Sequence, residues 1–243
     1  MSIVKTEGIF IGANQQNQVS DFNKERSLVA FGAGKTIALW NPLDSKNTGV
    51  IATLKGHNAD VTCVNFIHGT NLLVTASEDF HVKIWKFQDD DIINPHLECI
   101  QTIEHYTHTI VSLSVLPGVI VIGCANGLVS IWTQDPTNEE LFQLGHEVAI
   151  ERNVLPLSLS LSNVLANKYM LAIGGTNVHV FIFSFTINPE TNAIDNCKLA
   201  TKLEGHEDWV KSLAFRYQET AGDYILCSGS QDRYIRLWRI KIN

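Results

Sequence analysis

The chain has 243 residues, of which 45% are hydrophobic and 18% are charged, and 25 Asp and Glu outnumber 18 Lys and Arg to give a net charge of −7. This composition is typical of a globular protein with a sizeable core and excludes a disordered or fibrous chain. Nucleic-acid binding is disfavoured because the excess charge is acidic and no basic run could neutralise phosphates. The five cysteines include no C-x-x-C pair, so we expect free intracellular thiols. We expect no signal peptide, because residues 1–18 lack a basic flank, an apolar block and a small-residue cleavage site. We expect no membrane span, because the most apolar stretch, 113–132, is broken by Pro and Gly.

An apolar-x-apolar-aromatic signature recurs five times along the chain, and each copy is expected to form a β-strand. Its aromatic residues, here called the anchors, are Trp40, Trp85, Trp132, Phe181 and Trp238. The anchors recur at intervals of about 50 residues, a period that indicates a repeated supersecondary unit.

Each repeat is predicted to be a set of short strands joined by tight turns. A turn former stands six residues before each anchor, at Gly34, Asp79, Asn126, Gly175 and Asp232. A β-rich run before each turn predicts one strand, and the signature after the turn predicts a second. Alternating runs such as 61–66 and 210–215 predict a further strand ahead of these two, and runs such as 99–103 predict a fourth strand before the next repeat. The sequence therefore predicts an all-β chain that forms one β-propeller domain over residues 1–243, with five four-stranded blades.

Two of the repeats resemble the WD-repeat family, in which a His, a strand Ser or Thr, a turn Asp and a Trp form a hydrogen-bonded set within a blade. The matching residues are His57, Thr75, Asp79 and Trp85 in the second repeat and His206, Ser228, Asp232 and Trp238 in the fifth. Such a set would satisfy polar groups buried between blades, where an unpaired group is costly.

The other three repeats depart from this pattern. The first has no Gly-His pair, and the third has Glu104-His105 and Asn126 but no hydroxyl four residues before the turn. The fourth has Phe181 in place of Trp and places Gly145-His146 far upstream. We expect no complete polar set in these repeats.

Several features imitate catalytic or binding sites. A hydroxyl, a His and an Asp also make a hydrolase triad, but the same residues recur in two repeats and no Gly-x-Ser-x-Gly elbow accompanies them. The run 32–36 resembles the end of a phosphate-binding loop, yet it lacks the upstream Gly and precedes a strand instead of a helix. His96, His105 and His108 with Cys99 match no zinc spacing. The sequence predicts no catalytic, cofactor-binding or metal-binding residues.

Candidate partner contacts lie in the loops beside the two complete sets. They are Asp60, Glu78, Trp209 and Gln231. An exposed Trp is enriched at binding hot spots, so Trp209 is the strongest of the four. The alternative is that Trp209 packs against a neighbouring blade or the channel.

A closer resemblance covers nearly the whole chain. The runs 31–40, 54–57, 203–210 and 228–238 resemble a family of WD-repeat subunits of the Elongator complex. The resemblance implies five blades of a seven-bladed ring within a longer protein. It also implies a cytoplasmic and nuclear scaffold that contacts the other Elongator subunits, without a cofactor or direct nucleic-acid or membrane contact.

The activity implied by this resemblance is modification of the wobble uridine of tRNA, with catalysis in another subunit. The alternative function is a WD-repeat adaptor of a different complex that binds a basic peptide or histone tail through an acidic rim.

Overall fold

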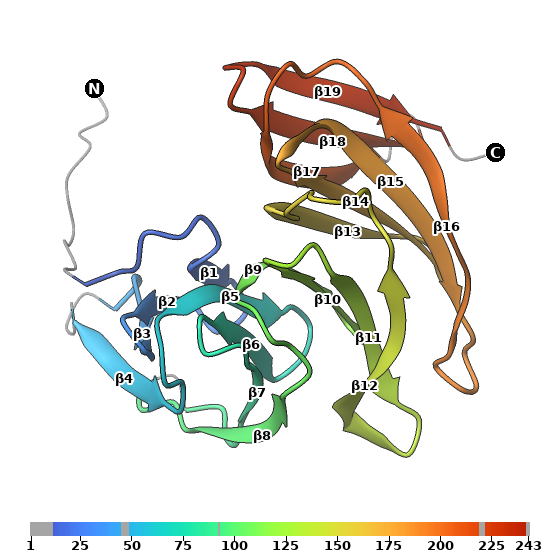
Figure 1. Ribbon diagram of the computed structural model, residues 1–243. Coiled ribbons are helices and arrows are strands. Elements are labelled where there is room, and N and C mark those ends of the chain that lie inside the picture. The colour runs from blue at the N-terminus through green and yellow to red at the C-terminus, as the bar shows by residue number, and fades with distance from the viewer. Residues whose placement is uncertain (1–11, 45–48, 92, 219–221, 242–243) are drawn as a thin grey trace. The chain divides into compact units, whose positions relative to one another are not determined.

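The computed structural model describes residues 12–44, 49–91, 93–218 and 222–241, which form a series of β-strands (Figure 1). No helical segment in these ranges has the length and apolarity needed to span a bilayer. The chain divides into two compact units, Met1–Ile110 and Val111–Asn243.

The first unit contains two four-stranded antiparallel sheets in which strands pair in chain order. Their strands are β1 (Ser20–Asn23), β2 (Leu28–Ala33), β3 (Thr36–Trp40), β4 (Val50–Lys55), β5 (Val61–Ile67), β6 (Leu72–Ser77), β7 (Val82–Phe87) and β8 (Leu97–Ile103). The core between the sheets includes Ile37 and Leu39 of β3 and Leu73 and Trp85 of β6 and β7, all at most 4% exposed. Alternation of apolar side chains along each strand supplies these inward faces.

The second unit contains three further antiparallel sheets. Their strands are β9 (Ile110–Leu116), β10 (Val119–Cys124), β11 (Val129–Asp135), β12 (Asn138–Val148), β13 (Ser158–Leu165), β14 (Lys168–Gly175), β15 (Asn177–Ile187), β16 (Ile194–Leu203), β17 (Val210–Gln218), β18 (Asp223–Ser230) and β19 (Ile235–Ile240). The third sheet packs on the fourth around Ile131 and Phe181, and the fourth packs on the fifth around Ile182 and Leu226.

Hydrogen bonds between first strands reinforce this stacking within each unit. In the first unit, Oδ2 of Asp21 on β1 accepts the main-chain N–H of Phe66 on β5 at 2.9 Å. In the second unit, the Oγ of Ser160 on β13 accepts the N–H of Phe215 on β17 at 3.0 Å. In each pair of sheets, a polar side chain on the first strand of one sheet thus fixes the position of the first strand of the next sheet along it.

The expected all-β architecture of repeated antiparallel sheets is confirmed. The first four sheets have four strands each, whereas the fifth has three among the residues described, not the four expected.

Strand register corrects the anchor of the fourth sheet from Phe181 to Phe183. The pairs that define the anchor position are Leu73–Trp85, Leu171–Phe183 and Leu226–Trp238. Counting back six residues from Phe183 gives Asn177 as the turn residue instead of Gly175, and Asn177 Oδ1 accepts the N–H of His179 at 3.2 Å. Both Phe residues fit the signature because β15 alternates over 11 residues, so only the pairing distinguishes them.

Candidate functional site

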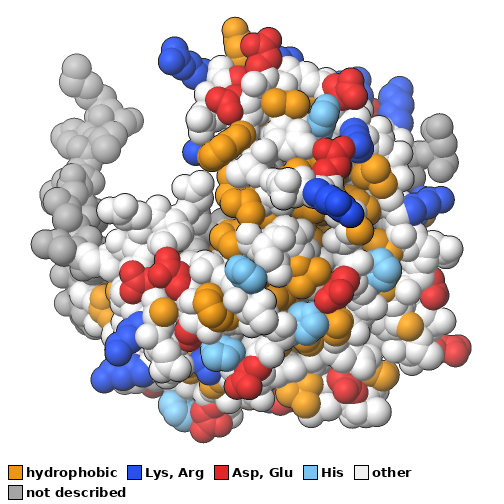
Figure 2. All heavy atoms as spheres, viewed as in Figure 1, with side chains coloured by type: hydrophobic (Ala, Val, Ile, Leu, Met, Phe, Trp, Pro, Cys, Tyr) orange, Lys and Arg blue, Asp and Glu red, His pale blue; other side chains and the backbone are white. Residues whose placement is uncertain are grey.

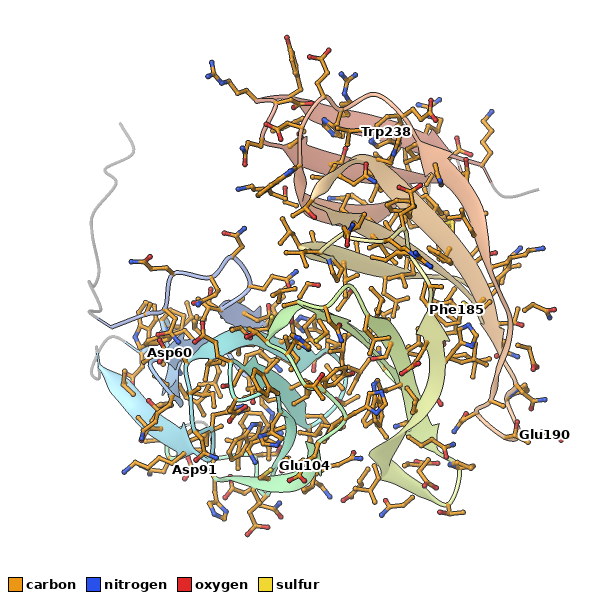
Figure 3. All side chains as sticks on the ribbon, in the orientation of Figure 1. Asp60, Asp91, Glu104, Phe185, Glu190 and Trp238 are labelled. Atoms are coloured by element: carbon orange, nitrogen blue, oxygen red, sulfur yellow. The ribbon has the colours of Figure 1, made fainter. Side chains whose placement is uncertain are left out.

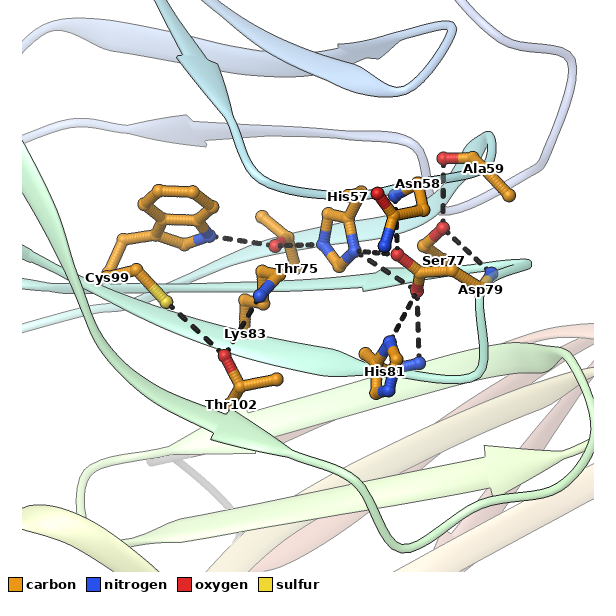
Figure 4. Close-up of polar contacts among 11 residues, drawn as sticks. His57, Asn58, Ala59, Thr75, Ser77, Asp79, His81, Lys83, Cys99 and Thr102 are labelled. Carbon is orange, nitrogen blue, oxygen red and sulfur yellow. Dashed lines mark hydrogen bonds and ion pairs between the residues drawn. The ribbon is translucent and has the colours of Figure 1, made fainter.

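The four predicted residues of the second repeat form one continuous chain of hydrogen bonds (Figure 4). The indole N–H of Trp85 on β7 donates to Thr75 Oγ1 on β6 at 2.9 Å. Thr75 Oγ1 lies 2.9 Å from Nε2 of His57, in the loop between β4 and β5, and His57 Nδ1 lies 3.0 Å from Oδ2 of Asp79 in the β6–β7 turn. Thr75 is 0% and His57 4% exposed, so the whole chain of contacts is buried.

The partners fix where the protons lie in this set. A carboxylate only accepts hydrogen bonds, so we assign a proton to His57 Nδ1, and Nε2 then accepts the hydroxyl proton of Thr75. The Thr75 oxygen in turn accepts the indole N–H of Trp85. The arrangement has the connectivity of a hydrolase triad, but its hydroxyl is closed to solvent and engaged on both sides, which fits a structural role.

Asp79 also accepts hydrogen bonds from the surrounding main chain. Its Oδ2 accepts the N–H of Asn58 at 2.8 Å and its Oδ1 accepts the N–H of His81 at 3.0 Å. Burial raises the pKa of Asp79, but the main-chain N–H of Asn58, the neighbouring His57 and the N–H of His81 together hold it below its ordinary value. Asp79 therefore stays ionised and keeps its three hydrogen-bonded neighbours in place.

His57 is predicted to make the protein less stable in mild acid. Burial lowers the pKa of His57 and outweighs Asp79, which raises it, so the folded chain binds this proton less tightly than the unfolded chain, whose His has a pKa near 6.5. The stabilising contribution is complete above this value and is lost as the pH falls through the lower pKa of the folded state. The advantage of the unmodified protein over His57→Gln should therefore shrink as the pH falls.

Urea midpoints at about pH 7.5 and about pH 5.5 test this linkage. His146→Gln is the matched control, because His146 is an exposed residue of β12. Parallel pH dependences of His57→Gln and the unmodified protein would contradict the assignment.

The fifth repeat reproduces the set with a serine. Trp238 Nε1–H on β19 donates to Ser228 Oγ on β18 at 2.8 Å, and the same oxygen lies 2.8 Å from His206 Nε2. His206 Nδ1 lies 2.7 Å from Oδ2 of Asp232, whose Oδ1 accepts the N–H of Tyr234 at 2.8 Å. Burial raises the pKa of Asp232, but the main-chain N–H of Tyr234 and other donors lower it well below the ordinary value.

The third repeat uses a hydroxyl that the sequence pattern did not reveal. Ile122 occupies the position of Thr75, and the residue paired with Ile122 across the sheet is Ser130. The indole N–H of Trp132 donates to Ser130 Oγ at 3.1 Å, so the acceptor has moved to the adjacent strand. The signal that could have revealed Ser130 is its place opposite Ile122, which depends on knowing the register.

The first and fourth repeats link loop and turn without a histidine. In the first, Asn14 Nδ2 donates to the carbonyl of Gly34 at 2.8 Å and Asn14 Oδ1 accepts the Gly34 N–H at 2.7 Å. In the fourth, Asn177 Nδ2 donates to Glu151 Oε2 at 2.8 Å. Gly145-His146, which the sequence offered as the pair of the fourth repeat, lies within β12 and forms no loop.

The four candidate contact residues form two equivalent pairs at the ends of strands. The N–H of Glu78 donates to the carbonyl of Asp60 at 2.9 Å, and the N–H of Gln231 donates to the carbonyl of Trp209 at 2.9 Å. All four side chains are exposed, and Figure 3 labels Asp60 in the loop before β5. Trp209 is 44% exposed, with the Nζ of Lys211 5.7 Å from its ring centre, so much of the indole is available to a partner.

The features that imitate binding sites take other roles in the structure. Gly34, with a φ of 58°, forms the turn between β2 and β3, so the run 32–36 is strand, turn and strand. Across the described ranges, no group of three or more His, Cys, Asp or Glu side chains could hold a metal ion. The five cysteines, all within the described ranges, form no disulfide with one another.

The two complete His, hydroxyl, Asp and Trp sets lie in the second and fifth repeats, and these two regions of the chain match a model of WD repeats. The family model described as WD domain, G-beta repeat, matches residues 49–86 and 197–239. The chain is 61% identical over 241 residues to Elongator complex protein 2 of Saccharomyces cerevisiae, a match that covers 99% of the chain and 30% of that protein.

Two more distant relatives carry different names. The Elongator complex protein 2 of Schizosaccharomyces pombe is 26% identical over 97% of the chain and 29% of its own length. Protein transport protein sec13 of Aspergillus fumigatus is 29% identical over 88% of the chain and 73% of its own length. The chain thus spans less than a third of the Elongator proteins that it resembles.

Proposed function

We propose that this chain is part of a non-catalytic scaffold subunit of the Elongator complex and acts in tRNA wobble-uridine modification. The observation that carries the proposal is the 61% identity to Elongator complex protein 2 across 99% of the chain. The buried sets support a structural role, because their hydroxyl, imidazole and carboxylate groups are engaged with one another. Catalysis then belongs to another subunit, and this chain supplies surfaces that hold the assembly together.

Its partners would be the other Elongator subunits, in the cytoplasm and the nucleus. Exposed loops on a rigid scaffold are suited to such contacts. The exposed residues Asp60, Glu78, Trp209 and Gln231 are the proposed contact positions.

Affinity purification of the tagged protein with mass spectrometry of what it retains tests this function. We expect the other Elongator subunits in fixed stoichiometry. Recovery of unrelated proteins with basic tails, and no Elongator subunit, would instead favour an adaptor that uses the acidic pair Asp60 and Glu78, and the Elongator proposal would fall.

Trp209→Ala is expected to weaken partner capture by about tenfold, the typical cost of losing an interface tryptophan. Stability should change by less than about 0.5 kcal/mol, since the indole is 44% exposed. The measurements are quantitative pull-down and thermal unfolding, with Leu43→Ala as a control at another exposed apolar residue. A large loss of stability with full capture would refute the contact role.

A further inference from the structure

A groove lies between the fourth and fifth sheets of the second unit, at the end where β13 finishes and β18 begins. In Figure 1, β13 and β17 lie side by side where these two sheets meet, and the hydrogen bond between Phe215 and Ser160 joins them. The groove consists of two cavities, of about 510 Å³ and about 280 Å³, which share Val164 and Lys168 as lining residues. Together they reach the size of typical ligand sites.

Apolar and aromatic side chains line both cavities. In the larger one, Tyr217 on β17 and Tyr224 on β18 face each other across the strand pair, with ring centres 4.9 Å apart. The hydroxyl of Tyr224 donates to the main-chain carbonyl of Asn163 at 3.0 Å, which holds this wall in place. Tyr217 is 48% and Leu165 62% exposed, so both offer apolar surface to a ligand. The apolar residues that line the smaller cavity include Met170, Ile182 and Ile240.

The charged residues that line the groove are lysines. Lys168 borders both cavities and Lys241 borders the smaller one, and no Asp or Glu among the described residues lines either. Neither lysine forms an ion pair within the described ranges. Asp223 points to the face of β18 opposite Tyr224, because successive side chains alternate, and lies 3.8 Å from Arg239 Nε. Figure 2 shows Lys and Arg side chains at several points over the fourth and fifth sheets, although the whole chain has a net charge of −7. The groove is therefore complementary to an anionic ligand.

We propose that this groove binds an extended acidic segment of a partner protein, which places apolar side chains in the two cavities and carboxylates beside Lys168 and Lys241. An extended segment suits two cavities that adjoin at Lys168, because its side chains recur on one face about every 7 Å. Asn163 and Ser184 add polar groups that can bond its main chain. The proposal deepens the scaffold function proposed above, on which it rests for the source of the segment, another subunit of the complex.

Selection from a random peptide library tests the chemistry of the ligand directly. The full-length protein that contains this chain is panned against phage-displayed peptides of about 12 residues, long enough in extended form to cross both cavities. Peptides retained by the unmodified protein but not by Lys168→Glu are synthesised with a fluorescent label, and their dissociation constants are measured by fluorescence anisotropy. We expect these peptides to have a net negative charge and at least one large apolar side chain, and to bind more weakly as salt is added.

Two variants with matched controls assign the binding to the groove. Lys168→Glu and Tyr217→Ser should each raise the dissociation constant about tenfold or more, because the first repels the acidic ligand and the second removes an aromatic wall. Lys198→Glu, at an exposed lysine of the same sheet, and Tyr234→Ser, at a tyrosine that is 62% exposed, line neither cavity. These controls should change the dissociation constant by less than about twofold. Thermal unfolding verifies the fold of each variant, and Lys241→Glu, at an exposed residue, replaces Lys168→Glu if that variant does not fold.

Equal retention of all selected peptides by Lys168→Glu and the unmodified protein would overturn the proposal. Selected peptides that depend on Lys168 but are basic, or that lack apolar residues, would also overturn it. The result is separable from the Elongator assignment, because the library contains no Elongator subunit. Acidic peptides bound by a protein that captures no Elongator subunit would leave the groove as a peptide site and remove the proposed scaffold function.

Discussion

Asp79→Ala should lower the free energy of unfolding by about 3 kcal/mol, because each buried group left unpaired costs about 1–3 kcal/mol. The carboxylate accepts hydrogen bonds from the imidazole of His57 and the main-chain N–H groups of Asn58 and His81. Its side chain is 6% exposed, so water replaces these contacts poorly. The measurement is urea unfolding followed by tryptophan fluorescence.

Asp60→Ala is the matched control for this loss. Asp60 lies in the β4–β5 loop with His57 and Asn58, but its side chain is exposed and it is the main-chain carbonyl that accepts the N–H of Glu78. Its removal should change stability by less than about 0.5 kcal/mol. Equal midpoints for Asp79→Ala and Asp60→Ala would show that the buried set contributes little to stability.

Thr75→Val should cost about 2 kcal/mol, because valine keeps the branched shape of threonine but has a methyl group in place of the hydrogen-bonding hydroxyl. The loss leaves the indole N–H of Trp85 without its acceptor and His57 Nε2 without its donor, in a position that is 0% exposed. Urea unfolding measures the effect.

Thr133→Val separates the role of the hydroxyl from the effect of burial. Thr133 on β11 is 1% exposed, and its Oγ1 has no hydrogen-bond partner among the described residues. The same substitution there should be neutral or stabilising, because it removes a buried polar atom that forms no bond. Similar losses in both variants would mean that shape, and not the hydrogen bond, makes Thr75 important.

The sequence was sufficient for the repeated sheets and for both complete sets. Turn residues such as Asp79 and Asp232 are local signals, and a strand that alternates apolar and polar residues reveals its buried face without knowledge of its neighbours. Both complete sets could be identified from the sequence because each of their positions holds the residue type that its hydrogen bond requires.

The strand register, and the replacement of one hydrogen-bonding residue by another on a facing strand, could not be predicted from the sequence. Phe181 and Phe183 both satisfy the local pattern, and only the pairing of Phe183 with Leu171 identifies the anchor. In the third repeat Ser130 takes the acceptor role of the facing position Ile122, and in the fourth Glu151 bonds the turn residue Asn177 where the complete sets have a histidine. A hydrogen bond can be made from either of two facing strands, so the chemistry persists where the motif has disappeared.

The position of each histidine also determines which strands unfold together. His57 lies in the loop after β4, the outer strand of the first sheet, and its imidazole is hydrogen-bonded to β6 and to the β6–β7 turn of the second sheet. His206, in the loop between β16 and β17, is hydrogen-bonded to Ser228 of β18 in the same way. Local unfolding of an outer strand therefore disturbs the histidine that is hydrogen-bonded to the middle of the next sheet. We expect the amide protons of β4 and β6 to exchange with solvent in one cooperative opening event.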